Sequence, residues 1–91
     1  MKRVEWNLEK DEWIKQKRGI GFNDVIKAIQ EGGLLDLRDH PNQIEYSGQM
    51  EFVVLIGDYV YVVPFVEDDE KLLLKTVFPS RKERKRYLRS K

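Results

Sequence analysis

Two long runs of strand-forming residues meet at a Gly-Asp pair in the second half of the chain. The runs 50–56 and 59–66 are rich in Val, Ile, Phe and Tyr, and Gly57-Asp58 lies between them. Glycine at the first central position suits a two-residue type II′ turn, because that position needs a positive φ. The sequence therefore predicts a β-hairpin over 50–66, against which the rest of the chain has to pack.

Further strands are predicted on both sides of this hairpin. A third strand over 71–78 follows the acidic turn 67–70, and the alternating segment 4–6 can open the chain as a short strand. Pro64 has no N–H for a strand ladder, so we expect it at an edge position or at a bulge. The polar segment 38–49, which contains a proline and a glycine, is expected to be a loop or an irregular edge.

Two helices are predicted in the first third of the chain. Asn7 is a suitable N-cap for a helix over 8–18, and Gly19 is a natural end for it. A second helix follows and ends at Gly32-Gly33, because apolar residues recur there on one helical face. These residues are Phe22, Val25, Ile26 and Ile29. We therefore expect an α+β fold, with two N-terminal helices packed on one face of an antiparallel sheet of three to four strands.

A short basic helix is predicted at the end of the chain. Ser80 and Glu83 have the spacing of a capping box, directly after Pro79. Tyr87 and Leu88 are the only apolar side chains that follow, too few for a stripe that faces a core. We expect this helix to be held weakly by the body of the protein, with its charge facing outward.

Composition excludes several classes of function. The 91 residues suffice for one domain, over 1–91. Without cysteine, the chain has no disulfide, thiolate zinc site or cysteine nucleophile, and its single histidine, His40, excludes two-histidine metal motifs. The first residues lack the apolar stretch of a signal peptide, and no stretch reaches the ~20 apolar residues of a membrane helix. We expect a soluble, cytoplasmic protein.

The net charge of +1 is unevenly distributed along the chain. Residues 1–79 contain 10 basic and 15 acidic side chains, a balance of −5, whereas residues 80–91 contain seven basic side chains and one acidic, a balance of +6. Three interpretations of the basic segment stay open. It can be a solvated tail, a phosphate-binding surface with salt-dependent affinity for nucleic acid, or a group of cations that stabilise the transition state of RNA cleavage.

Other features can carry chemistry but have simpler explanations. His40 can act as a general base, although a lone histidine in a polar loop is more often solvated. Trp6 and Trp13 can stack on bases, yet their positions favour packing in the core. The carboxylates at 67–70 lack the spacing of metal ligands and are expected to be solvated turn charge.

Two groups of residues, one near each end of the chain, form a recognisable order. The first comprises Trp6-Asn7, Lys10, Lys17-Arg18-Gly19-Ile20 and Phe22. The second runs from Lys75 to Lys82 and continues with Lys85-Arg86-Tyr87 in the basic helix. In order and spacing these groups resemble the opening and closing patterns of the BrnT-type toxins, with Arg18 where that family has a histidine.

The resemblance spans essentially the whole chain and is strongest over 5–26 and 72–87. BrnT-type toxins are small RelE-like ribonucleases of type II toxin–antitoxin systems. The resemblance implies a RelE-like fold, metal-independent RNA cleavage that slows translation, and no cofactor. It also implies two partners and no membrane. These are RNA and a cognate antitoxin, usually a ribbon-helix-helix protein, through which the complex binds operator DNA.

Site residues follow from the same resemblance. The candidate catalytic residues are Lys17, Arg18, Arg81, Lys82, Lys85 and Tyr87. Arg81 and Lys82 are assigned to phosphate binding and transition-state charge, whereas Lys17, Arg18 or Tyr87 are assigned to proton transfer or positioning. The basic residues assigned to RNA binding are Lys75, Arg84, Arg86 and Arg89. The alternative is a non-catalytic module that binds RNA or protein through the same basic segment.

Overall fold

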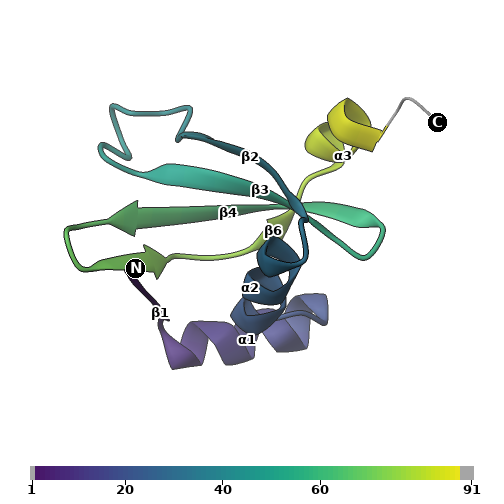
Figure 1. The fold of residues 1–91 in the computed structure, drawn as a ribbon, viewed down its shortest axis with the longest axis horizontal. Helices are drawn as coiled ribbons and strands as arrows, with labels where there is room; N and C mark the ends of the chain where they lie inside the picture. Colours follow the sequence, from purple (N-terminus) through teal and green to yellow (C-terminus); the bar gives the residue numbers. More distant parts are fainter. Residues whose placement is uncertain (1, 89–91) are drawn as a thin grey trace.

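The computed structural model describes residues 2–88, and over this range the chain forms six strands and three helices in an α+β arrangement (Figure 1). In chain order the elements are β1 (Arg3–Trp6), α1 (Leu8–Arg18), α2 (Phe22–Gln30), β2 (Leu34–Asp39), β3 (Met50–Ile56), β4 (Tyr59–Glu67), β5 (Lys71–Leu74), β6 (Phe78–Pro79) and α3 (Arg81–Leu88). The strands form one sheet in the order β1-β5-β4-β3-β2, and β6 also pairs with β4.

The predicted hairpin lies at the centre of the sheet. β3 and β4 pair without a break from Met50↔Phe65 to Ile56↔Tyr59. Gly57 has a φ of +65°, and no residue other than glycine in 2–88 has a positive φ, so Asp58 has a negative one. This combination fits the type II′ turn that the sequence predicts, because that turn needs a positive φ at its first central residue alone.

The predicted third strand is divided into two short ones. β5 pairs with the end of β4 and β6 with its beginning, so that Val63 and Pro64 face the three residues from Lys75 to Val77. The extra residue is a bulge-like interruption. The carbonyl of Pro64 accepts the N–H of Lys75 at 2.8 Å. Proline therefore lies where a ladder N–H is not required, as predicted from its missing donor.

The predicted sheet is wrong in two respects. It is mixed rather than antiparallel, because β1 runs parallel to β5 with Arg3 opposite Lys71 and Trp6 opposite Leu74. It also has more strands than three to four, since β2 pairs with β3 and takes in the start of the segment 38–49 that we expected to be a loop. A register shift early in β2 interrupts its alternation of apolar and polar residues, which hides the strand from pattern-based reading.

α1 begins and ends as predicted, and α2 ends at Gln30, just before the predicted Gly32-Gly33. The side chain of Asn7 accepts the N–H of Lys10 at 2.9 Å, and Gly19 ends α1 with a φ of +75°. The connection to α2 depends on Asp11, which is buried and accepts the N–H of Phe22 at 2.8 Å. A Cβ at Gly21 would lie 2.7 Å from Asp11 Oδ1, so glycine is needed for this close approach.

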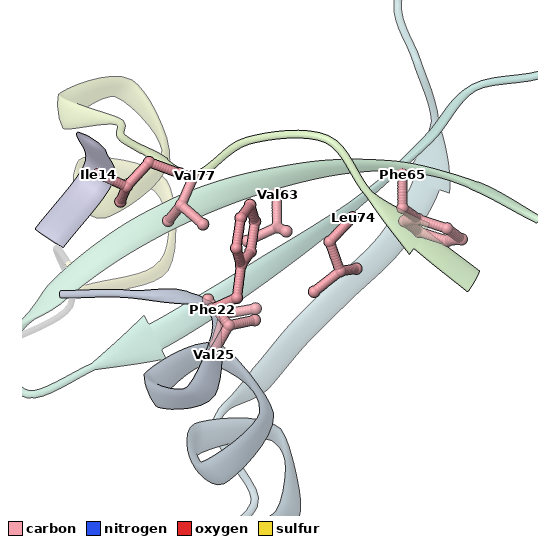
Figure 2. Packing of buried hydrophobic residues seen from close by; sticks show 8 residues of the cluster. Ile14, Phe22, Val25, Val63, Phe65, Leu74 and Val77 are labelled. Atoms are coloured by element: carbon pink, nitrogen blue, oxygen red, sulfur yellow. The ribbon is translucent and has the colours of Figure 1, made fainter. Parts of the chain in front are cut away.

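The main core lies between α1, α2 and one face of the sheet. Figure 2 shows Phe22 and Val25 of α2 pointing toward Val63, with Ile14 of α1 beside Val77. The opposite face carries Val53 and Val62, which are register partners, and α3 packs on that side against β4. In Figure 1, α1 and α2 accordingly lie below the strands and α3 above them. No helix within residues 2–88 is long and apolar enough to cross a membrane.

Replacement of Asp11 by alanine is expected to destabilise the fold by about 2 kcal/mol, because the first N–H of α2 loses its acceptor in a buried setting. Urea denaturation followed by circular dichroism measures the change in the free energy of unfolding. The matched control is Glu12→Ala, whose exposed carboxylate lies 3.8 Å from Lys15 Nζ. That change is expected to cost under about 0.5 kcal/mol, and equal losses for the two variants would contradict the assigned role of Asp11.

Candidate functional site

The start of α3 is fixed to the sheet by Ser80. The Ser80 N–H donates to the carbonyl of Val60 at 2.9 Å, and Ser80 Oγ accepts the N–H of Glu83 at 3.2 Å. Half of the predicted capping box is therefore present. The other half is absent, because the Ser80 N–H is already used by the sheet. The carboxylate of Glu83 is free to reach elsewhere.

Glu83 points into the protein and binds Arg38 of β2. Arg38 Nη2 lies 3.0 Å from Glu83 Oε2, and Arg38 Nε donates to Glu51 Oε1 of β3 at 3.0 Å. Both carboxylates are buried, since Glu51 and Glu83 are each only 4% exposed. Partial burial by itself lowers the pKa of Arg38, but the hydrogen bonds to Glu83 and Glu51 outweigh it and raise that pKa overall.

Two further side chains flank this ion pair network. Arg86 Nη1 lies 3.9 Å from Glu83 Oε1, a buried oxygen without a hydrogen-bond partner in the described part of the chain. His40 Nε2 lies 4.0 Å from Glu51 Oε2, and the imidazole packs against the ring of Tyr46. His40 Nδ1 accepts the N–H of Asn42 at 3.0 Å, a geometry that suits the neutral ring with its proton on Nε2.

His40 is thus not the solvated loop residue that its surroundings in the sequence suggest, since its side chain is 16% exposed. Its ring edge faces Glu51 rather than open solvent. The network of Arg38, Glu51 and Glu83 escaped sequence reasoning because its members lie on β2, β3 and α3. Arg38 and Glu51 become neighbours through the β2–β3 register, and no local pattern encodes that pairing.

Other polar contacts complete the attachment of α3. The Tyr87 hydroxyl donates to Asp36 Oδ2 at 3.0 Å, and Arg84 Nε donates to the carbonyl of Asp58 at 3.2 Å. The Arg84 guanidinium also lies 5.1 Å from the centre of the Tyr59 ring. The expectation of a weakly held helix with outward charge is therefore wrong in part. α3 lacks an apolar stripe, but buried and half-buried polar groups attach it to the body.

Tyr87 keeps its proton at neutral pH. Burial raises the pKa of this phenol above its usual value, and the hydrogen bond to Asp36 raises it further. Of the two roles expected for Tyr87, positioning fits this environment better than proton transfer, because Asp36 holds its one proton.

The remaining basic side chains of α3 face solvent. Arg81, Lys82 and Lys85 are exposed, and none of them pairs with a carboxylate of residues 2–88. Lys75, also exposed, lies in the interruption between β5 and β6. Arg89 lies outside the described residues. The structure thus gathers most of the expected basic site on one short helix.

Two expected site residues lie elsewhere. Lys17 and Arg18 end α1, which is on the other side of the strands from α3 in Figure 1. Both side chains are exposed, and the Arg18 guanidinium lies 5.9 Å from the centre of the Trp13 ring. The structure therefore does not place Lys17 and Arg18 in the row of cations on α3.

The two tryptophans differ in their surroundings. Trp6 packs against Phe22 with ring centres 5.5 Å apart, as predicted for a core residue. Trp13 is 44% exposed, so its predicted core packing is wrong.

In the acidic turn 67–70, Asp68 accepts the N–H groups of Glu70 and Lys71, and these hydrogen bonds lower the pKa of its carboxyl group. Across residues 2–88, no group of three or more His, Asp or Glu side chains is placed to hold a metal ion.

Comparisons with known proteins yield no assignment: no protein-family model matches the chain, and no curated protein matches it.

Replacement of Arg38 by methionine is expected to cost about 3 kcal/mol of stability, because Glu51 and Glu83 would remain buried without their shared cation. The triple variant Arg38→Met/Glu51→Gln/Glu83→Gln is expected to recover part of this loss, since no buried charge is left. Chemical denaturation of the variants measures both effects. Arg3→Met, which removes an exposed guanidinium 3.3 Å from Glu5, is the control. A loss as small as the control's would refute the role of Arg38.

Replacement of Tyr87 by phenylalanine is expected to cost about 1 kcal/mol at neutral pH, because the hydrogen bond to Asp36 is lost. The raised pKa of Tyr87 means that its contribution is complete below pH ~10 and disappears as the pH rises through that pKa. The stability gap between wild type and Tyr87→Phe should therefore narrow in alkaline solution. A gap of constant size up to pH ~12 would count against the assignment.

Proposed function

We propose that this protein is a BrnT-type, RelE-like toxin: a metal-independent endoribonuclease that inhibits translation and is neutralised by a cognate antitoxin. The observation that carries the proposal is the row of exposed cations on α3, a helix held to the sheet by the buried pair of Glu83 and Arg38. A charged helix that serves only for solubility has no need of a buried carboxylate that holds it in place.

The proposed reaction uses the RNA's own 2′-hydroxyl as nucleophile. A bond forms between the 2′-oxygen and phosphorus, and the bond to the 5′-oxygen breaks, which leaves a 2′,3′-cyclic phosphate and a 5′-hydroxyl end. The 2′-hydroxyl gives up its proton to water, and the leaving 5′-oxygen takes one up from water. Negative charge builds up on the phosphoryl oxygens, and Arg81 and Lys82 are placed at the start of α3 to stabilise it. Guanidinium and ammonium groups can supply this charge themselves, so the proposed chemistry needs no metal ion.

The other candidate residues take supporting roles in this proposal. Lys85 adds positive charge one turn after Arg81, and Lys75, Arg84 and Arg86 add further contacts to the RNA backbone. Tyr87, whose proton is held in the hydrogen bond to Asp36, is suited to positioning rather than to proton transfer. Lys17 and Arg18, on α1, are suited to position RNA rather than to contact the reacting phosphate.

The partner of the proposed toxin is an antitoxin, expected to be a ribbon-helix-helix protein that also binds operator DNA. This part of the proposal rests on the sequence resemblance. A reading frame for such a protein next to the gene would support it.

The experiment is RNA cleavage by the purified protein in EDTA, beside the double variant Arg81→Ala/Lys82→Ala. The variant is expected to cleave at least about 100-fold more slowly, because two charges that stabilise the transition state are lost. The matched control is Arg3→Ala/Lys27→Ala, which removes the same charge away from α3 and is expected to change the rate less than about threefold.

The outcomes separate an enzyme from a binding module. Selective loss in the α3 variant supports the ribonuclease, and equal loss in both double variants would show general electrostatic binding instead. If the folded wild type binds RNA with salt-dependent affinity, yet neither cleaves it nor inhibits translation on ribosomes, the proposal is wrong. The protein would then be a non-catalytic RNA-binding module.

A further inference from the structure

Trp13 presents its indole ring to solvent from the surface of α1. The buried residues of α1 are Asp11 and Ile14, which face α2 and the sheet, whereas Trp13 is 44% exposed. An exposed tryptophan in a helix that already contributes to the core calls for an explanation, because the indole is one of the largest apolar side chains.

Cations surround this ring. Lys10 Nζ lies 4.8 Å from the ring centre, and the Arg18 guanidinium lies 5.9 Å from it. Lys17 follows Trp13 by one helical turn and is exposed on the same side of α1. One acidic side chain, Glu9, precedes Trp13 by one turn, so the cations outnumber it three to one.

The other carboxylates of α1 are directed away from these cations. Asp11 and Glu12 both pair with Lys15, at 3.2 Å and 3.8 Å. Lys10 and Lys17 form no ion pair with a carboxylate of residues 2–88. The acidic groups of the helix therefore leave the positive charge around Trp13 largely uncompensated.

We propose that Trp13, with Lys10, Lys17 and Arg18, is a binding site for single-stranded RNA, in which a base stacks on the indole and the cations contact the flanking phosphates. The inference rests on the proposed function in that RNA is its ligand, and it adds a second RNA-contacting surface across the sheet from α3. Stacking of a base on an aromatic ring is stronger than an exposed cation–π contact, so a base displaces Lys10 from the ring and its ammonium group moves to a phosphate.

Single-stranded RNA fits this surface better than a protein partner. A flat apolar ring with cations before and after it along α1 matches the alternation of base and phosphate along a single strand. A protein interface of similar size would need a larger apolar area around the tryptophan, and Leu8, the other exposed apolar residue of α1, stands at the far end of the helix.

The test is fluorescence of the Trp6→Phe variant, in which Trp13 is the single tryptophan and an aromatic ring still packs against Phe22. The probe is a single-stranded oligoribonucleotide with 2′-O-methyl sugars, which cannot react through its 2′-oxygen. Stacking is expected to quench the fluorescence, and a duplex of the same sequence, whose bases are already stacked, is expected to quench it far less.

Affinity measurements on the wild-type background complete the test. Trp13→Ala is expected to weaken binding of the oligonucleotide about tenfold, and Trp13→Phe is expected to recover part of that loss. Lys10→Gln/Lys17→Gln is expected to lower the slope of log K against log salt by about 0.7 for each phosphate contact removed. The matched control is Leu8→Ala, which removes an exposed apolar side chain from the same helix and should leave the affinity unchanged.

These outcomes are independent of catalysis, because the probe is unreactive. Trp13→Ala binding at wild-type affinity would overturn the inference, and so would equal quenching by single strand and duplex. Arg81→Ala/Lys82→Ala should slow cleavage of ordinary RNA at least about 100-fold while the Trp13 quench remains. A quench by a wild-type protein that neither cleaves RNA nor inhibits translation on ribosomes would refute the ribonuclease and leave this RNA site standing.

Discussion

The ion pairs between Arg38 and its two buried carboxylates join three elements that lie far apart in the chain. Glu51 comes from the central hairpin, Arg38 from the edge strand β2 and Glu83 from the terminal helix α3. Each of these three charged groups loses most of its hydration when the protein folds. The ion pairs and hydrogen bonds among them offset that free-energy cost, so removal of one partner leaves the others buried and unpaired. The attachment of α3 depends on these interactions, since the helix has no apolar stripe of its own.

The attachment of α3 to the sheet determines where its row of cations lies. Arg81, Lys82 and Lys85 repel one another and would favour an unfolded tail if nothing anchored the helix. Glu83 compensates part of this repulsion from the buried side, and Ser80 fixes the first turn to β4. The positive charge of α3 therefore lies on one side of the sheet, while α1, with Trp13 and its neighbouring cations, lies on the other.

The predictions that succeeded concern interactions between residues close in sequence. The Gly57 turn, the Asn7 cap and the end of α1 at Gly19 each depend on a few neighbouring residues. Trp13 shows the limit of such local reasoning. An indole on a helix that packs against a sheet is expected in the core, and only the rotation of that helix against the sheet decides whether it is buried. In α1 the buried positions are held by Ile14 and by Asp11, which accepts the first N–H of α2 where an apolar side chain is usually found.

The sequence by itself determined the central hairpin, the two N-terminal helices and the concentration of positive charge after residue 80, because turn chemistry, helix caps and composition are local properties. The tertiary structure alone decided that β1 pairs in parallel with β5, that β2 joins the sheet, and that Arg38 meets Glu51 and Glu83. Each of these depends on contacts between residues far apart in the chain, and their free energy comes from burial and pairing that no short segment can supply.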